Sequence, residues 1–384
     1  MMLVVTNDSS SPRSVQWAAT MEGFAQDDVV RAHRDSFAML DPHDERLVAS
    51  SSRDAREERL DLSLAHGATR EHGAGERALP EEPDLYRTCF ERDRDRILHS
   101  TSFRRLSGKT QVFVFPDDHM RTRLTHALEV AQVATSVARA LGLNTALTDA
   151  IALGHDCGHG PGGHASEEAL DPYLEGGFDH ATWGADVSLV SLNLCRETLD
   201  GIRNHSWSRP APGTLEGEVV SWADRIAYVC HDFEDAASAG LVAFDDLPAL
   251  VRERCGVSRR EQLGAFINAM IATTRATGII GMDPLHAEAL AAFRAFNYSS
   301  IYMRDASRLQ AQRVVGMLRA LVEHYVANPG LLPDDEFPRD VAGSPGAVAA
   351  AVSYVAGMTD RFACRSAVAL LEWPIDQLPN GIDR

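Results

Sequence analysis

The sequence lacks several features that would each point to a particular class of protein. It contains no run of about 18 or more apolar residues, so no membrane-spanning helix is expected. Its first residues lack the charged-then-apolar pattern of a secretion signal, and we therefore expect a cytoplasmic protein with no membrane partner. The six cysteines are scattered and include no CxxC pair, which argues against a disulfide framework and a thiolate zinc site.

A basic excess is also lacking. The chain carries 37 Lys and Arg against 55 Asp and Glu, a formal net charge of −18. A protein without a basic excess gains little from releasing the counterions of a phosphate backbone. Nucleic acid is therefore not an expected partner, although the charge does not exclude it. A polyanionic small substrate would need cations gathered locally.

The 384-residue chain divides into three regions by composition. Residues 1–56 are polar and are predicted to form a loosely ordered N-terminal extension, with a short helix around Gln26 to Leu40. A core is expected over 57–240, and a C-terminal helical region over 241–384 that packs on the core and completes the site. Beyond Asp84 the apolar pattern is helical, with TQVFVF (110–115) the one short stretch predicted to be extended. The fold class is therefore all-α.

Helical periodicity places several polar residues on interior faces. The spacing predicts a helix over 124–141 whose apolar stripe includes His126. A second helix is predicted to begin near Asn144 or Thr145 and to end in the glycine-rich turn that follows His155 and Asp156. A third, over 215–237, puts Asp224 beside an apolar face. A late segment, 351–363, is predicted as one further apolar helix ending at Asp360.

His126, His155, Asp156 and Asp224 together form an H…HD…D pattern. Neutral imidazole is the commonest metal ligand, and carboxylates supply the charge that a hard divalent cation needs. Taken singly, each residue has an ordinary structural explanation: a buried histidine is usually hydrogen-bonded, and a second His-Asp pair occurs at 231–232. The joint pattern favours a site for Mn²⁺ or Mg²⁺, with Fe²⁺ also compatible, that hydrolyses a phosphate ester.

The glycine-rich stretch after Asp156 carries further candidates for proton transfer. His164 and Glu167 are three residues apart, so a helix beginning near Ala165 would pair them as an acid/base dyad. His159 and His180 are additional acid/base or cationic candidates, although His180 could equally be a surface histidine. Three arginines near the proposed metal are candidates for binding phosphate: Arg121, Arg123 and Arg225.

Several long segments, in order over about Arg56 to Ala363, resemble the HD-domain deoxynucleotide triphosphohydrolases, the bacterial dGTPase-like, type 2-like group. They are ERDRDRILHSTSFRRLSGKTQVF (91–113), RTRLTHALEVAQVA (121–134), HDCGHGPGGHASE (155–167), TLEGEVVSWADRIAYVCHDFEDA (214–236) and YVAGMTDRFA (354–363). The chain departs from the family at Gly162, where relatives often carry an aromatic residue.

The resemblance implies an HD-superfamily helical fold and hydrolysis of dGTP or other dNTPs to deoxynucleoside and tripolyphosphate. It supports the four metal ligands above and implies the following roles for other residues. Catalytic or phosphate-contacting groups would be His159, His164, Glu167 and His180; sugar contacts would be Gln111, Tyr228 and Asp232; phosphate contacts would be Arg123 and Arg225. Tyr228 could instead be a core aromatic residue, and Asp232 a surface carboxylate. The resemblance also implies a homo-oligomer and a dNTP effector.

Two other functions are compatible with the sequence. One is an HD-type nucleotidase or phosphodiesterase acting on monophosphates or cyclic nucleotides. The other is a regulator that binds dNTPs without turning them over. The arginines near the metal pattern argue against the first, and the acid/base candidates argue against the second.

Overall fold

The computed structural model describes residues 12–18, 23–26, 28–37, 40–41, 43–46, 52–333, 337 and 340–380. The chain divides into two compact units, Met1–Ser51 and Ser52–Arg384. The first contains helix α1 (Pro12–Ala18) and an antiparallel hairpin of β1 (Phe24–Gln26) and β2 (Val29–Arg31). The helix predicted around residues 26–40 is therefore wrong where the structure describes it. The adjacent β-branched Val29 and Val30 favour the extended backbone. Much of the predicted extension lies outside the described residues.

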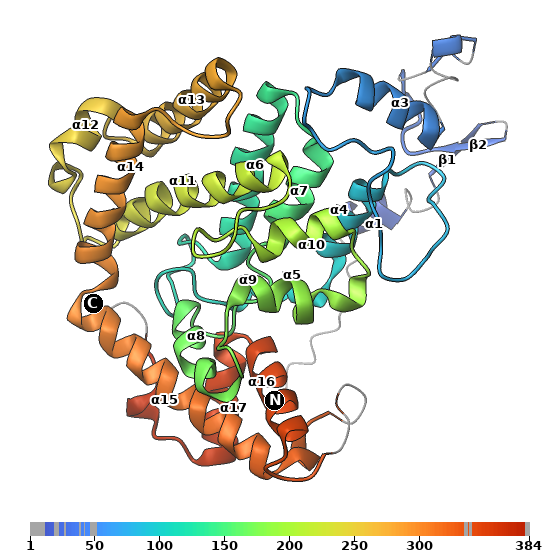
Figure 1. Cartoon of the computed structure of the whole chain (residues 1–384). Helices are drawn as coiled ribbons and strands as arrows, with labels where there is room; N and C mark the ends of the chain where they lie inside the picture. The colour runs from blue at the N-terminus through green and yellow to red at the C-terminus, as the bar shows by residue number, and fades with distance from the viewer. Residues whose placement is uncertain are drawn as a thin grey trace. The chain divides into compact units, whose positions relative to one another are not determined.

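The second unit is helical (Figure 1). Its helices are α3 (Arg53–Ser63), α4 (Cys89–His99), α5 (Thr101–Arg105), α6 (Arg123–Leu141), α7 (Thr145–Gly154), α8 (His164–Leu170), α9 (His180–Trp183), α10 (Arg196–Arg203), α11 (Leu215–Ser238), α12 (Ala249–Cys255), α13 (Arg259–Thr277), α14 (Pro284–Asn297), α15 (Asp305–Ala327), α16 (Pro345–Gly357) and α17 (Asp360–Leu371). Short 3₁₀ and π turns join several of them. Because the one sheet described is the two-stranded hairpin, the all-α prediction is confirmed.

Local signals explain where α6 and α7 begin and end. The Thr122 amide donates to the Thr125 side chain at the start of α6 (3.0 Å), and Gly142 ends the helix in the left-handed conformation (φ 70°). The Asn144 side chain then accepts from the amides of Ala146 and Leu147 and begins α7. Both helices match the predicted ranges.

The largest hydrophobic core lies between α4, α6, α7, α10, α11 and α12 to α14. Small and β-branched side chains, among them Ala134, Ile151 and Ala227, are fully buried where α6, α7 and α11 pack together. Small residues at these contacts bring the helix backbones close to one another. The same packing directs the polar residues on the inner faces of these helices toward a common point.

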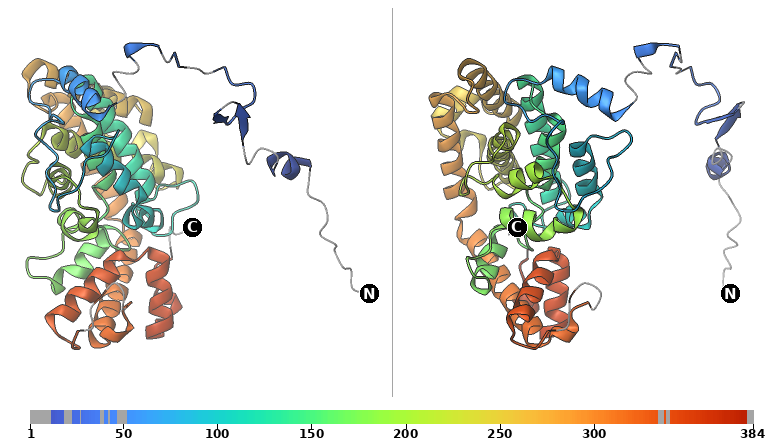
Figure 2. Two further views of the ribbon diagram at one scale, coloured as in Figure 1. Left: turned by 90° about the vertical axis from the view of Figure 1, so that its right-hand side faces the viewer. Right: turned by 45° about the vertical axis from the view of Figure 1, so that its right-hand side comes forward.

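A second hydrophobic core joins α8 to α15, α16 and α17. Figures 1 and 2 show these helices gathered at one end of the second unit. The single helix predicted over 351–363 is wrong, because α16 ends at Gly357 and α17 begins at Asp360. Thr359 caps α17 by accepting a hydrogen bond from the Phe362 amide (3.4 Å).

The extended stretch predicted at TQVFVF is also wrong. Thr110 forms one isolated bridge with Thr122, and residues 111–115 follow as a series of bends. Phe113 packs with Met120 and Ile301, whereas Val114 packs in the core around α15. Because these side chains are buried in different clusters, the backbone must turn between them. No neighbouring strand in the described part of the chain pairs with this stretch to hold it extended.

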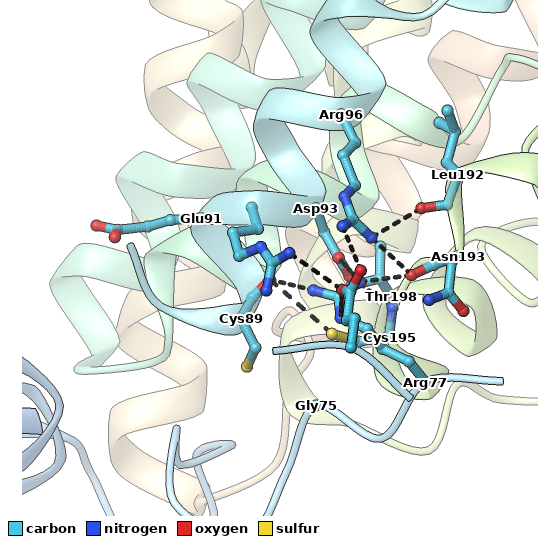
Figure 3. A network of polar contacts seen from close by, with 12 residues as sticks. Gly75, Arg77, Cys89, Glu91, Asp93, Arg96, Leu192, Asn193, Cys195 and Thr198 are labelled. Carbon is cyan, nitrogen blue, oxygen red and sulfur yellow. Dashed lines mark hydrogen bonds and ion pairs between the residues drawn. The ribbon is translucent and has the colours of Figure 1, made fainter. Parts of the chain in front are cut away.

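A buried polar network fixes the segment that precedes α4 (Figure 3). Asp93 of α4 accepts from the Arg77 guanidinium (2.6 Å), the Cys195 amide (2.8 Å) and the Thr198 hydroxyl (2.7 Å). These bonds satisfy the buried carboxylate and tie the segment around Arg77 to the start of α10. All six cysteines are free, and all except the half-buried Cys89 are buried, as expected for reduced thiols.

No helix in the described part of the chain is long and apolar enough to cross a membrane. The division predicted between residues 57–240 and 241–384 stays a prediction.

Candidate metal centre and active site

The structure brings the four predicted metal ligands together. His126 comes from the first turn of α6, His155 and Asp156 from the end of α7, and Asp224 from the middle of α11. His126 Nε2 lies 3.0 Å from Asp224 Oδ1, and His155 Nε2 lies 3.7 Å from the same oxygen and 3.6 Å from Asp156 Oδ1. Ligand atoms of His126, His155 and Asp224 all lie within 4.8 Å of one another, a spacing that suits a shared cation.

The tautomer of His155 supports binding of a cation. Its Nδ1 lies 2.6 Å from the Ala152 carbonyl oxygen, which requires Nδ1 to donate and leaves a lone pair on Nε2. Nε2 is buried without a hydrogen bond and faces the carboxylates of Asp156 and Asp224. A lone pair and two anionic oxygens that face one another repel, so these residues fit a divalent cation bound among them.

Charge interactions keep the two carboxylates ionised. Burial alone would raise the pKa of Asp156, but the charge of the adjacent Arg123 guanidinium outweighs it and holds that pKa well below its usual value. Burial is likewise outweighed at Asp224, whose pKa is lowered chiefly by its hydrogen bond with His126. Both groups are therefore charged near neutral pH, as ligands of a hard cation must be.

Arg123 and His159 contact the two carboxylate oxygens of Asp156. Arg123 Nη1 donates to Asp156 Oδ2 (2.6 Å), and its Nε and Nη2 are buried without a hydrogen bond. His159 Nε2 lies 3.2 Å from Asp156 Oδ1, and its ring stacks on that of His180 with centroids 3.8 Å apart. Arg123 therefore retains two unused donors for an anionic ligand.

The predicted pairing of Glu167 with His164 is wrong. Glu167 Oε1 accepts from both the backbone amide (3.1 Å) and the ring Nδ1 (2.5 Å) of His180. Burial opposes the charged forms, but the pairing outweighs it: the pKa of Glu167 falls to about 2, and that of His180 rises above its usual value. The acid/base dyad in the structure is Glu167 with His180.

His164 is left facing the site. It is the first residue of α8, and its ring centroid lies 5.0 Å from that of His159 and 5.9 Å from that of His180. Within the residues that the structure describes, its ring makes no hydrogen bond, and burial against the site lowers its pKa to about 4. A free imidazole in this position is available to a ligand.

Most of these groups line a cavity of about 510 Å³. The volume is in the range of small-molecule sites, roughly 300–1,000 Å³. The lining includes every predicted site residue except Arg121, His155 and Glu167; the lining members are Gln111, Arg123, His126, Asp156, His159, His164, His180, Asp224, Arg225, Tyr228 and Asp232. The cavity therefore unites the predicted metal ligands with the predicted phosphate and sugar contacts.

Comparison with known proteins agrees with this geometry. The HD domain model matches residues 123–229, and the phosphohydrolase-associated domain model matches residues 280–368. A deoxyguanosinetriphosphate triphosphohydrolase-like protein of Caldanaerobacter subterraneus subsp. tengcongensis is 42% identical over 75% of this chain and 86% of its own. This chain belongs to the HD-domain dNTP triphosphohydrolase-like family. Similar relatives with that name are those of Clostridium perfringens strain SM101 (40% identity, 73% of this chain, 86% of the relative) and, as protein 1, of Deinococcus radiodurans (35%, 81% and 99%).

In this HD-domain phosphohydrolase, polar groups line the cavity away from the metal ligands. Tyr302 donates its hydroxyl to Asp232 Oδ2 (2.6 Å). Burial raises the pKa of Asp232 to about 7, so near neutral pH its carboxyl can donate as well as accept. Gln111 Oε1 is buried without a hydrogen bond. Arg294 Nε donates to the Tyr228 hydroxyl (2.8 Å). These groups can bind a polar ligand.

The three arginines predicted near the metal have different surroundings. Arg225 lies over the Trp207 ring, 3.5 Å from its centroid, and lines the cavity as Arg123 does. Arg121 lies elsewhere: its guanidinium binds the carboxylates of Glu129, Glu234 and Asp235. The prediction that Arg121 serves the site is wrong, because these three acids neutralise it in a network between α6 and α11.

Sequence reasoning missed several residues of the site. His205 is buried beside His155, with ring centroids 5.0 Å apart, and its Nε2 lies 3.3 Å from that of His180. The other missed members line the cavity: Trp207, Arg294, Tyr302 and Arg304. They come from the loop after α10 and from the end of α14 and start of α15, where no local motif marks them. Only the tertiary fold brings them to the site.

Proposed function

We propose that this protein is a metal-dependent dNTP triphosphohydrolase that converts dGTP or other dNTPs to deoxynucleoside and tripolyphosphate. One observation carries the proposal: a single cavity joins the H…HD…D ligands to unused arginine donors and to a separate group of neutral hydrogen-bonding side chains. A nucleoside triphosphate needs all three, because it has a polyanionic end, a scissile ester and a polar sugar. The names of the relatives agree with this substrate class.

The metal ligands in this proposal are His126, His155, Asp156 and Asp224, with Mn²⁺ or Mg²⁺ as the preferred ion and Fe²⁺ compatible with the same donors. The ion supplies positive charge that polarises a phosphoryl oxygen and favours ionisation of the attacking water. Arg123 and Arg225 bind the triphosphate through guanidinium nitrogens that no protein group occupies.

The histidines beside Asp156 carry out proton transfer in this proposal. Glu167 holds His180 in one orientation and stabilises its protonated form. His159 stacks on His180, and His164 faces the cavity with its ring free. The 5′ oxygen of the leaving deoxynucleoside would take a proton from this group of imidazoles.

The sugar is bound in this proposal by Gln111, Asp232 and Tyr228. The Gln111 carbonyl oxygen lacks a partner, and the Asp232 carboxyl, oriented by Tyr302, can both donate and accept. These groups would bind the 3′-hydroxyl, and the Tyr228 ring would close the space beside the 2′ carbon. A ribose would then meet the ring with its 2′-hydroxyl.

Product analysis tests the proposal. Purified protein with Mn²⁺ and each dNTP in turn should release tripolyphosphate and deoxynucleoside in equal amounts, measured by ³¹P NMR and chromatography. Stepwise release of orthophosphate or pyrophosphate would favour a nucleotidase or phosphodiesterase. Tight dNTP binding without any product would favour a regulator.

Replacing Tyr228 with alanine should relax discrimination against ribose. We expect the ratio of kcat/KM for rNTPs to that for dNTPs to rise about 10- to 100-fold, the scale at which a pocket distinguishes substrates that differ by one small group. Tyr228→Phe keeps the ring and should leave the ratio unchanged. Tyr298→Ala is a matched control, because Tyr298 lines the same cavity but is half exposed. A parent-like ratio in Tyr228→Ala would contradict the assignment.

The homo-oligomer, the dNTP effector and the cytoplasmic location stay predictions. That nucleic acid is not an expected partner, and that there is no membrane partner, likewise stay predictions from composition.

A further inference from the structure

The loop between Asp156 and α8 carries His159 and ends at His164, yet it has few side chains to fix its own shape. Gly162 and Gly163 adopt left-handed backbone conformations, with φ of 75° and 62°. A Cβ atom at Gly163 would lie 2.9 Å from the Thr110 carbonyl oxygen. Glycine permits this close approach but leaves the backbone conformationally free. Contacts from outside the loop must therefore hold it in place.

Asp360 supplies one of these contacts from the first turn of α17. Its Oδ1 accepts from the Gly162 amide (2.8 Å), and its Oδ2 accepts from the Thr110 hydroxyl (2.6 Å). The residue is 6% exposed. One buried carboxylate thus connects the loop to the residue that directly precedes Gln111 in the cavity wall.

Lys109 supplies a second contact at the other end of the loop. Its Nζ donates to the His159 carbonyl oxygen and to the Ala356 carbonyl oxygen (3.0 Å). Burial lowers the pKa of this ammonium to about 8, and the nearby Asp360 carboxylate partly opposes the shift. Lys109 and Asp360 together hold the loop at His159 and at Gly162.

Lys109 and Asp360 act through hydrogen bonds and not through apolar packing in a hydrophobic core. Their hydrogen bonds go to the backbone of the loop, to Thr110 and to the end of α16, so they connect three segments far apart in the sequence. Gly162 also packs closely on α15, since a Cβ there would lie 2.5 Å from Val314 Cγ1. Any larger side chain at Gly162 would collide with Val314 unless that residue moved.

We propose that Asp360 is a positioning residue that, with Lys109, sets the geometry of His159 and His164 from the C-terminal helices. The inference rests on the proposed function, in which those imidazoles act on the substrate. Asp360 itself does not line the cavity. Its effect is therefore exerted through the loop backbone, on the placement of rings that must meet the substrate precisely.

Asp360→Asn in the full-length protein tests the inference, because the amide keeps the shape but loses the charge and one acceptor. We expect kcat for the preferred dNTP to fall about 100-fold, the scale associated with a misplacement of about 1 Å. KM and Mn²⁺ affinity should stay near those of the parent, since the metal ligands and arginines are intact. A parent-like kcat in the folded variant would overturn the proposal, as would a fall in melting temperature without a change in kcat.

Thr110→Val provides a second test if Asp360→Asn does not fold, since it removes one hydrogen bond to the carboxylate. A reduced kcat supports the proposal, and a parent-like kcat overturns it. Asp54→Asn, which also changes a first-turn aspartate but on the exposed surface of α3, is the matched control.

Histidine NMR separates this inference from the proposed function. In ¹⁵N-histidine-labelled protein without substrate, Asp360→Asn should shift the ring signals of His159 and His164, whereas Asp54→Asn should not. If the parent hydrolyses no dNTP, the proposed function fails, but shifted ring signals would still support the positioning contact. Unchanged ring signals would overturn it whatever the activity.

Discussion

The Asp156→Ala protein is expected to bind no Mn²⁺ and to release no detectable tripolyphosphate. Asp156 lies at the centre of the site, where its Oδ1 faces His155 and His159 and its Oδ2 accepts from Arg123. Losing the carboxylate removes a charged ligand and leaves the buried Arg123 without its counter-ion. Breaking a buried ion pair in this way costs about 3–5 kcal/mol of stability. Metal content by mass spectrometry, product release and the melting temperature measure the three effects.

Two further variants separate loss of the ligand from loss of stability. Asp156→Asn keeps the side-chain volume and a hydrogen-bond acceptor for Arg123, so it should fold better than the alanine variant and still lose metal and turnover. Asp149→Asn changes a carboxylate on α7, the helix that ends just before Asp156, away from the cavity, and should behave like the parent. Metal binding and turnover that survived in a folded Asp156→Asn protein would remove Asp156 from the ligand set.

Glu167→Gln should lower kcat by roughly 10²- to 10⁴-fold, the usual scale for an acid/base group. Glu167 accepts two hydrogen bonds from His180 and is the source of its raised pKa. A glutamine would keep the shape of the side chain but would no longer stabilise the charged imidazole. Steady-state kinetics with the preferred dNTP and saturating Mn²⁺ measure the loss.

A double-mutant cycle identifies the partner of Glu167. Because Glu167 and His180 act as one unit, Glu167→Gln combined with His180→Asn should cost no more than the worse single change. The effects of Glu167→Gln and His164→Ala should instead multiply. The adjacent Glu168→Gln on the exposed side of α8 is the control and should match the parent. Strong coupling of Glu167 to His164 in place of His180 would contradict the structural pairing.

The metal ligands could be predicted because helix periodicity determines which way a side chain faces. His126 lies on the same buried stripe of α6 as Val130 and Val133, and Asp224 follows the fully buried Ala223 on α11. The glycine-rich sequence after Asp156 correctly indicated where α7 ends. Because these signals are local, they can be recognised in the sequence without knowledge of the tertiary fold.

The partner of Glu167 could not be predicted in the same way. Spacing along α8 favours His164, three residues away, whereas the structure offers two donors from His180, 13 residues away in sequence. Arg121 shows the same limit, because sequence reasoning placed it by its distance from His126, while three acids from α6 and α11 neutralise it. A polar side chain pairs with the best-placed partner in the folded protein, and that partner often comes from a segment distant in sequence.

The wall of the cavity opposite the metal ligands also depends on tertiary structure. Arg294 and Tyr302 approach Tyr228 and Asp232 only because α14 and the following turn pack beside α11. TQVFVF (110–115) appeared extended because β-branched and aromatic residues favour a strand. Its apolar side chains are instead buried in different clusters: Val112 and Phe113 in one, Val114 and Phe115 in another.

Anomalous X-ray scattering from crystals grown with Mn²⁺ and a non-hydrolysable dNTP analogue would test the central claim most directly. We predict one strong manganese peak within about 2.3 Å of Nε2 of His126 and His155 and of a carboxylate oxygen of Asp156 and Asp224, a normal ligand distance. The triphosphate should lie beside it, in contact with Arg123 and Arg225, and the sugar near Asp232. A manganese peak elsewhere, or a nucleotide bound outside this cavity, would contradict the account.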